Sequence, residues 1–338
     1  MIGYYVHHHG HGHRHRALAT ARAYGRGVTG LSTQAAPPGW PGDWLQLPDD
    51  DLPPAVGERT AHGLLHHVPD HHPGLRARMA LLSAWCAANA PSLLVADVSV
   101  EVALLARLHG VPVVSMGMPG VRTDAAHHLG YGISDLVIGP WPAEAREVLA
   151  TGHLDLDDRL VSVGAISRYP PQRDAAPVAH GRVLALSGSG GSSLTAADLG
   201  RARASTPGWT WDALGPAGRW VPDPWPLLCT AEVVVTHAGQ NAVAEVAAAR
   251  RPAVVVPQDR PFGEQHATGR ALTELGLPAV VLDGWPEPGA WPGVLDRAAA
   301  LDGSDWRRWN DGRGADRAAA LLAGVAASGV VAPAGERA

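Results

Sequence analysis

Six histidines lie between residues 7 and 16, in the run HHHGHGHRHR. A neutral imidazole can take a proton from a hydroxyl group, and it can also bind a transition metal. Glycine and arginine interrupt the run, which lies between a predicted strand at Ile2–Val6 and a predicted helix from Ala17. These features argue against a purification tag and leave two hypotheses, a catalytic loop and a metal-binding loop.

The metal hypothesis rests on His11, His13 and His15, which alternate along the run. Neutral imidazoles are common ligands, so adventitious binding of nickel or zinc is expected. No cysteine or carboxylate in the same loop completes a site. We therefore expect no resident metal and no other cofactor.

A second loop, SGSGGSS at residues 187–193, follows a predicted strand at Val183–Leu186. Its backbone N–H groups and hydroxyls suit a phosphate, although glycine and serine also form ordinary flexible connectors. By itself this loop fits either a phosphate site or a flexible connector.

A third loop lies in the segment 233–265, where a predicted strand ends at Thr236 and Gly239 begins a predicted helix. Such a helix N-terminus, preceded by His237, is a diphosphate site that needs no lysine. Glu245 lies among alanine and valine in the same helix. It is either a half-exposed helix charge or a carboxylate that accepts two ribose hydroxyls.

The composition narrows the class of function. All 27 residues in the combined lysine and arginine count are arginine, which excludes a lysine-containing phosphate loop and a Schiff-base lysine. The net charge of −5 argues against a nucleic-acid-binding protein. Cys86 and Cys229 form no CxxC pair, and the sequence predicts neither a signal peptide nor a transmembrane segment. We expect a cytoplasmic protein, either free or in peripheral contact with a membrane, that binds small molecules.

Short apolar strands alternate with helical patterns, which is typical of the α/β class with parallel sheets. In the first half we predict strands at Ile2–Val6, Leu93–Asp97, Val111–Ser115 and Leu136–Gly139, and helices at Ala17–Tyr24 and Val100–His109. In the second half we predict strands at Val183–Leu186, Val233–Thr236, Ala253–Pro257 and Ala279–Leu282.

This pattern predicts two Rossmann-like, doubly wound domains that face each other across a cleft. The first would span residues 1–166 and the second residues 182–305. A proline-rich stretch at 167–181 would be the linker between them. A helical segment at 306–338 would follow and return to the first domain.

With these motifs in place, the chain resembles glycosyltransferases of the GT-B fold, in the MurG-like and UDP-glycosyltransferase-like group. The first motif is G-x-G-H-x-x-R at residues 10–16, and the second is V-x-D ending at Asp97. The third lies within residues 237–265, where H-x-G-x-x-x-x-x-E is followed by P-x-x-x-x-x-x-E-Q. The resemblance therefore covers both halves of the chain.

The resemblance implies that His13 is the base that deprotonates the acceptor hydroxyl and that Asp97 orients its ring. Gly12 and Arg16 would lie on the acceptor side. Two alternatives remain for this pair: Asp97 merely caps the following helix, or Glu101 replaces it as the partner of the histidine.

The resemblance also implies where the donor binds. The expected donor-binding residues are Ser187, Gly188, Ser189, Gly190, Val221 beside Trp220, His237, Gly239, Gln240, Asn241, Glu245, Glu264 and Gln265. The family usually has a glycine where this chain has Asn241, and an aspartate where it has Glu264. These departures concern the donor sugar.

The expected function is an inverting glycosyltransferase, either a hexosyltransferase or an N-acetylhexosaminyltransferase. Its partners would be a nucleotide-sugar donor, UDP-linked by preference, and a small-molecule or lipid-linked hydroxyl acceptor, with no metal and no nucleic acid. It would act as a monomer or homodimer. Five further histidines at 62–72 either line the acceptor cleft or belong to a solvated loop. The alternatives are a nucleotide-sugar epimerase on the same fold and a non-catalytic, histidine-rich metal-binding protein.

Overall fold

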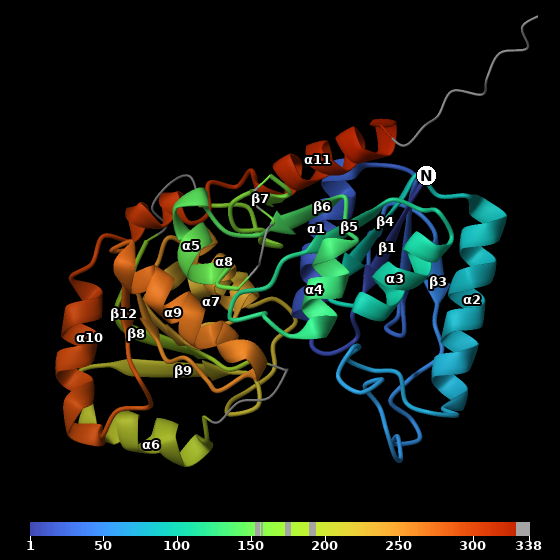
Figure 1. The fold of residues 1–338 in the computed structure, drawn as a ribbon. Coiled ribbons are helices and arrows are strands. Elements are labelled where there is room, and N and C mark those ends of the chain that lie inside the picture. The colour runs from blue at the N-terminus through green and yellow to red at the C-terminus, as the bar shows by residue number, and fades with distance from the viewer. Residues whose placement is uncertain (153–155, 157, 173–176, 189–193, 329–338) are drawn as a thin grey trace, which may run out of the picture.

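Two α/β lobes lie side by side, and each is built on one parallel sheet (Figure 1). The computed structural model describes residues 1–152, 156, 158–172, 177–188 and 194–328. Within these ranges no helix is both long and apolar enough to cross a membrane. The predicted class of two doubly wound parallel sheets is confirmed.

The first lobe holds a seven-stranded sheet with the order β3-β2-β1-β4-β5-β6-β7. Its strands are β1 (Ile2–Val6), β2 (Val28–Ser32), β3 (Trp44–Gln46), β4 (Leu93–Asp97), β5 (Val113–Met116), β6 (Leu136–Gly139) and β7 (Leu160–Ser162). Strands β1 and β4 are buried at every position, as expected for strands that helices cover on both faces. The winding direction changes between β1 and β4, so their carboxyl ends open a crevice.

The helices of this lobe are α1 (Gly12–Tyr24), α2 (Pro73–Asn89), α3 (Val100–Leu108), α4 (Ala125–Gly132) and the short α5 (Arg146–Leu149), which follows the 3₁₀ helix η1 (Ala143–Ala145). Helix α1 begins at Gly12, earlier than the predicted Ala17. Gly10 takes the left-handed backbone conformation, with φ 74°, so that the turn out of β1 closes before the histidine-arginine run ends. His13 and Arg16 therefore lie on the first turns of α1.

The second lobe holds a five-stranded sheet with the order β12-β11-β10-β8-β9. Its strands are β8 (Ala179–Leu186), β9 (Thr210–Leu214), β10 (Ala231–Thr236), β11 (Ala253–Val255) and β12 (Ala279–Val281). Its helices are α6 (Ala196–Ser205), α7 (Trp225–Thr230), α8 (Gln240–Ala249), α9 (Glu264–Glu274) and α10 (Trp291–Ala299), with 3₁₀ helices η2 (Pro261–Gly263) and η3 (Pro288–Ala290). Here the winding changes direction between β8 and β10.

Several predicted boundaries differ from the structure. Strand β8 begins at Ala179, inside the stretch predicted as linker, because Ala179 pairs with Ala231 of β10. Strand β5 begins and ends later than the predicted Val111–Ser115, and β11 ends before the predicted Pro257. The predicted C-terminal helical segment consists of a 3₁₀ helix, η4 (Gly303–Arg308), and then helix α11 (Gly314–Ser328).

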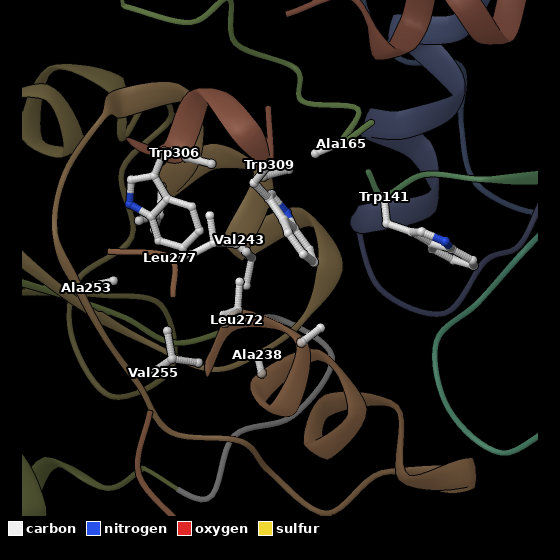
Figure 2. Packing of buried hydrophobic residues seen from close by; sticks show 14 of the residues in the cluster. Trp141, Ala165, Ala238, Val243, Ala253, Val255, Leu272, Leu277, Trp306 and Trp309 are labelled. Atoms are coloured by element: carbon white, nitrogen blue, oxygen red, sulfur yellow. The ribbon is translucent and has the colours of Figure 1, made fainter. Parts of the chain in front are cut away.

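The hydrophobic core continues between the lobes (Figure 2). Trp306 and Trp309 of the C-terminal segment pack with Val243 of α8 and Leu272 of α9, and Trp141 of the first lobe belongs to the same cluster. The indole N–H of Trp306 donates to the Arg251 carbonyl at 2.8 Å. Burial of about 200 Å² per tryptophan contributes at most about 5 kcal/mol.

Helix α11 lies across the first lobe and packs against α1 (Figure 1). Ala318 and Leu322 of α11 are buried there beside Ala17 and Ala21 of α1. This contact and the core of Figure 2 tie the C-terminal segment to both lobes.

Candidate active site

A cleft of about 1040 Å³ lies between the lobes, where the carboxyl ends of the two sheets face each other. Its walls come from the first turns of α1, the N-terminus of α8 and the loops after β8, β9 and β11. The predicted site residues that line it are Gly12, His13, Arg16, Ser187, Gly188, Val221, His237, Gly239, Gln240, Asn241, Glu245, Glu264 and Gln265. Asp97 lies behind this surface and is fully buried, while Ser189 and Gly190 lie outside the described residues.

His13 and Asp97 form the pair expected from the resemblance. The His13 Nδ1 atom lies 2.9 Å from the Asp97 Oδ1 atom. Asp97 ends β4, and the cap of the following helix α3 is the Ser99 side chain, which accepts from the backbone N–H of Val102. Glu101 instead accepts from the backbone N–H groups of His66 and His67. Both alternatives for Asp97 are therefore wrong.

Arg16 fixes the charge on Asp97. Its guanidinium contacts both carboxylate oxygens, with Nη2 to Oδ1 at 2.5 Å and Nε to Oδ2 at 3.3 Å. Burial alone would raise the pKa of Asp97, but the charges of Arg16 and His13 outweigh it and hold that pKa well below its usual range. An ionised Asp97 accepts the Nδ1 proton of His13. The lone pair is then on Nε2 of His13, a residue that lines the cleft.

On the opposite wall, His237 directly follows β10 and precedes α8. Its Nδ1 atom accepts a hydrogen bond from the backbone N–H of Gly239 at 2.9 Å. A neutral ring that accepts at Nδ1 carries its proton on Nε2, so His237 presents a donor. Burial, with a smaller contribution from Arg260, lowers its pKa to about 4. His237 is therefore neutral at physiological pH.

The N-terminus of α8 lies beside this ring. Gly239 is its N-cap and supplies no side-chain cap, so the first backbone N–H groups of the helix remain as donors. A Cβ atom at Gly188 would lie 2.6 Å from the His237 Nε2 atom. Only glycine lets the loop after β8 approach the ring so closely. Ser187, in contrast, uses its hydroxyl within the lobe, donating to the Leu214 carbonyl at 2.9 Å.

Gln265 is buried and holds the loop before α8. Its Oε1 atom accepts from the backbone N–H groups of Ala238 and Gln258, at 3.1 and 3.0 Å. Its amide NH₂ group is thus the part available as a donor. Glu264 lies 3.5 Å from Nη2 of Arg122, a residue of the first lobe. Burial raises the pKa of Glu264, and Arg122 opposes that effect.

Glu245 is buried on α8 and paired with Arg168. The Arg168 Nε atom lies 2.8 Å from the Glu245 Oε1 atom, and Nη2 donates to Oε2 at 3.2 Å. Burial raises the pKa of Glu245 in spite of Arg168. The interpretation of Glu245 as a half-exposed surface charge is therefore wrong. Val221 lines the cleft nearby, and the neighbouring Trp220 is exposed.

Two contacts join the walls directly. The Arg16 Nη1 atom donates to Gln240 Oε1 at 2.9 Å. A Cβ atom at Gly12 would lie 2.4 Å from the Asn241 amide nitrogen, so glycine is needed for this approach. Arg16, predicted on the acceptor side, thus also links Asp97 to the first turn of α8.

The alternating histidines do not gather into one cluster. His13 pairs with Asp97, whereas the rings of His11 and His15 stack with centroids 6.3 Å apart. In the stretch 62–72, His66 lies beside Asp124 of the α4 N-terminus and His67 beside the loop after β3. Both side chains are partly exposed.

Sequence reasoning missed the arginines that pair with the predicted carboxylates. Arg168 fell in the predicted linker and Arg122 in a loop, and neither lies in a motif. A carboxylate predicted to be buried was the one available signal, because a buried charge needs a partner.

Acid should destabilise the protein because buried histidines must take up protons. The pKa is lowered to about 4 for His237 and to about 3 for His15, in each case mainly by burial. Unfolded histidine binds a proton below about pH 6.5, so stability is complete above that value and falls as the pH decreases toward 4. We expect a loss of about 2 kcal/mol for His237 between pH 7 and pH 5.

Thermal denaturation from pH 7.5 to pH 4.5 measures this effect. His237→Gln, which cannot titrate, should show a smaller decrease in Tm over that range, whereas His128→Ala on the surface of α4 should match the wild type. An unchanged wild-type Tm across this range would contradict the buried-histidine explanation.

Comparison with known proteins agrees with this geometry. Residues 225–283, from α7 to just beyond β12, match the model of the glycosyltransferase family 28 C-terminal domain. An uncharacterized glycosyltransferase of Methanopyrus kandleri is 34% identical over 118 residues. The match covers 34% of this chain and 33% of the relative, so it spans about a third of that relative's length.

Solved structures resemble nearly the whole chain. The glycotransferase of kitacinnamycin has a TM-score of 0.70 and 18% identity, covering 96% of this chain and 98% of its own. MurG of Acinetobacter baumannii has a TM-score of 0.59 and 15% identity, covering 97% and 99%. The protein LpCGTa, solved with UDP, has a TM-score of 0.62 and 15% identity, covering 96% and 98%.

The two facing doubly wound lobes have the GT-B fold of glycosyltransferases. Residues 225–283 of the second lobe match the family 28 C-terminal domain, and the structures that the whole chain resembles include MurG. The predicted resemblance is thereby confirmed.

Proposed function

We propose that the protein is an inverting glycosyltransferase. It would transfer a hexosyl or N-acetylhexosaminyl group from a nucleoside diphosphate sugar, with UDP-sugar as the first candidate, to a hydroxyl of a small-molecule or lipid-linked acceptor. One observation carries the proposal: His13, which is paired with Asp97, and the donors around His237 line opposite walls of one cleft. The resemblance to LpCGTa, which was solved with UDP, supports the choice of nucleotide.

His13 would act as the general base. Its Nε2 atom takes the proton of the acceptor hydroxyl while the oxygen attacks the anomeric carbon and the bond to the diphosphate breaks. The imidazolium that forms is stabilised by Asp97. This carboxylate stays ionised because the positive charge of Arg16 lowers its pKa. Attack opposite the leaving group inverts the anomeric carbon.

The opposite wall would take the charge that the diphosphate acquires. The His237 Nε2–H group and the uncapped N–H groups of α8 are donors held in place before the reaction. We propose that these donors stabilise the diphosphate as a bound cation would, so that the transfer needs no metal. The Gln265 amide group and Glu264 would bind the donor sugar.

Glu245 would bind the ribose hydroxyls of the donor. Its carboxylate oxygens contact Arg168, and both residues line the cleft. A carboxylate can accept from Arg168 and from hydroxyl groups at the same time, since each oxygen has two lone pairs. Arg168 thus opposes the rise in the pKa of Glu245 that its burial causes.

Donor binding tests the proposal. We expect UDP or a UDP-sugar to raise the Tm with or without a chelator, more than the corresponding TDP, GDP or ADP compound does. A ligand at about a hundred times its Kd stabilises by about 2.7 kcal/mol. Glu245→Gln should weaken nucleotide binding about 10–100-fold, because it replaces charge-assisted hydrogen bonds with neutral ones. The surface variant Glu274→Gln on α9 should bind as the wild type does.

The outcomes separate the alternatives. No stabilisation by any nucleotide would contradict the transferase and favour the non-catalytic alternative. If UDP-sugar is turned over without an acceptor and no free UDP is released, the protein is an epimerase. Release of UDP that depends on an added hydroxyl compound would support transfer.

A further inference from the structure

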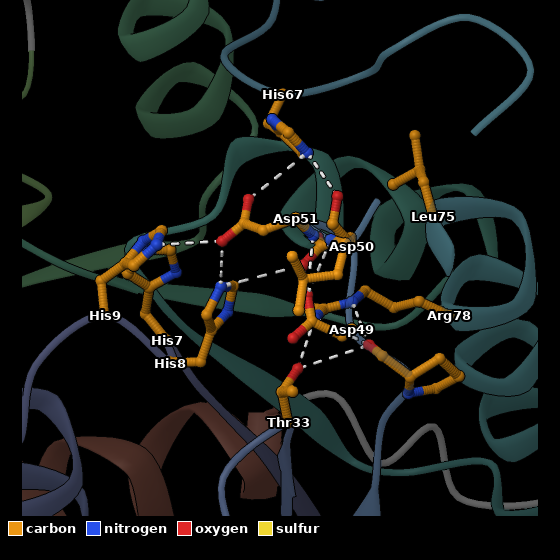
Figure 3. A network of polar contacts seen from close by, with 12 residues as sticks. His7, His8, His9, Thr33, Asp49, Asp50, Asp51, His67, Leu75 and Arg78 are labelled. Atoms are coloured by element: carbon orange, nitrogen blue, oxygen red, sulfur yellow. Dashed lines mark hydrogen bonds and ion pairs between the residues drawn. The ribbon is translucent and has the colours of Figure 1, made fainter. Parts of the chain in front are cut away.

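Several histidines of the first lobe gather outside the proposed transfer machinery (Figure 3). The side chains of His8 and His9 point toward Asp51, which comes from the loop after β3. The Nε2 atoms of His8 and His9 lie 2.7 and 2.9 Å from the same oxygen, Asp51 Oδ2. We propose that His8, His9 and Asp51 form a binding site for a zinc ion.

The donor set and its spacing fit zinc. Two imidazoles and one carboxylate are the protein ligands of a well-known type of zinc site that keeps a fourth position open. Ligands about 2.05 Å from a tetrahedral ion lie about 3.3 Å apart. Each of the two nitrogens would therefore move about 0.4 to 0.6 Å away from the Asp51 oxygen to admit the ion. His67 Nε2, at 3.8 Å from Asp51 Oδ1, is a nearby potential fourth ligand.

The loop that carries Asp51 is anchored before any ion binds. Asp50 pairs with the buried Arg78 at 2.6 Å. Arg78 also donates to the Pro48 carbonyl at 2.9 Å and to the Tyr5 hydroxyl at 2.8 Å. The carboxylate of Asp49 also accepts a hydrogen bond from the backbone N–H of Asp51. Such support holds the ligand in position and increases metal affinity.

The histidines are held as well. Gln34 donates through its Nε2 atom to the backbone carbonyls of His8 at 2.5 Å and Gly10 at 3.0 Å. The His7 ring lies 5.0 and 4.9 Å from the rings of His8 and His9. This region has three carboxylates, from Asp49, Asp50 and Asp51, against the single positive charge of Arg78. The surplus of negative charge favours a cation.

Among the described residues, one other cluster has three potential ligands, formed by His66, Asp124 and His127. There Arg122 lies 2.9 Å from the Nε2 atom of His127, so a guanidinium already places positive charge against the cluster. Asp124 also caps α4 by accepting from the His127 backbone N–H. These contacts favour the His8–His9–Asp51 cluster as the zinc site.

His9 also lines the cleft. An ion held by three protein ligands would thus have an open position accessible to an oxygen or nitrogen atom of a bound molecule. The identification of that molecule as the acceptor rests on the proposed function; zinc binding itself does not. The proposed zinc ion would play no part in stabilising the diphosphate, which the N-terminus of α8 would do without a metal.

The test is zinc binding to the full chain without any donor or acceptor. Calorimetric titration with Zn²⁺ from a weak chelator buffer measures the affinity, and Co²⁺ substitution gives an absorption spectrum that reports the ligand set. We expect Asp51→Asn, and separately the double variant H8A/H9A, to lower zinc affinity by at least 10–100-fold, the cost of losing even an outer partner of a ligand. His66→Ala should stay within about twofold of wild type.

Circular dichroism and the Tm establish that each variant is folded, and Asp51→Asn preserves the side-chain shape. Wild-type affinity in Asp51→Asn, or a Co²⁺ spectrum unchanged in H8A/H9A, would overturn the proposal. An equal loss in His66→Ala would show an adventitious ion only. If zinc binds as expected but no nucleotide does, the zinc site stands and the transferase proposal fails.

Discussion

Replacement of His13 with alanine should lower the kcat of sugar transfer by about 10²–10⁴-fold, the usual contribution of a general base. The donor KM should change little, because the donors assigned to the diphosphate lie on the other lobe around His237. Initial rates at saturating donor measure the effect.

Asp97→Asn tests the second member of the His13–Asp97 pair. Asparagine keeps the shape but removes the negative charge that holds the Nδ1 proton and stabilises the imidazolium, so kcat should decrease strongly here too. The double variant should be little worse than either single variant, because the two residues act as a unit. His128→Ala, an exposed histidine of the same lobe, is the matched control. A His13→Ala enzyme with wild-type kcat would remove His13 as the base.

Much of this arrangement is predictable from the sequence. Parallel strands buried on both faces are continuous apolar runs, so β1, β4 and β6 were predicted with the bounds that the structure has. The carboxyl ends of such strands meet at one edge of a sheet. The resemblance implied that the histidine after β1 and the aspartate at the end of β4 form a pair, and His13 and Asp97 do lie close together.

The unpredicted parts depend on chain segments that carry no local signal. Strand β3 has three residues, and the loop that follows it carries Asp51 back to the histidines after β1. The histidine loop itself contains no carboxylate. The carboxylate comes from a position more than forty residues away, 51 against 8, and only the fold brings it there. Arg168 reaches Glu245 in the same way.

Replacement of His237 with alanine should lower kcat by about 10²–10³-fold, the cost of removing one preorganised donor from a developing negative charge. The Gly239 N–H fixes the ring so that Nε2–H is the donor, and alanine removes that proton. His237→Gln, whose amide can donate, should recover part of the rate. His266→Ala, a partly exposed histidine of the same lobe, should leave kcat unchanged.

The pH dependence of this loss separates a neutral donor from a cation. Because the pKa of His237 is lowered to about 4, its ring is neutral between pH 5.5 and pH 9. The ratio of wild-type to His237→Ala kcat should therefore be constant across that range. A ratio that grows as the pH falls from 7.5 to 5.5 would mean that a protonated His237 stabilises the diphosphate, and the hydrogen bond from Gly239 would then have to break. A constant ratio near one would leave the N-terminus of α8 as the sole support for the leaving group.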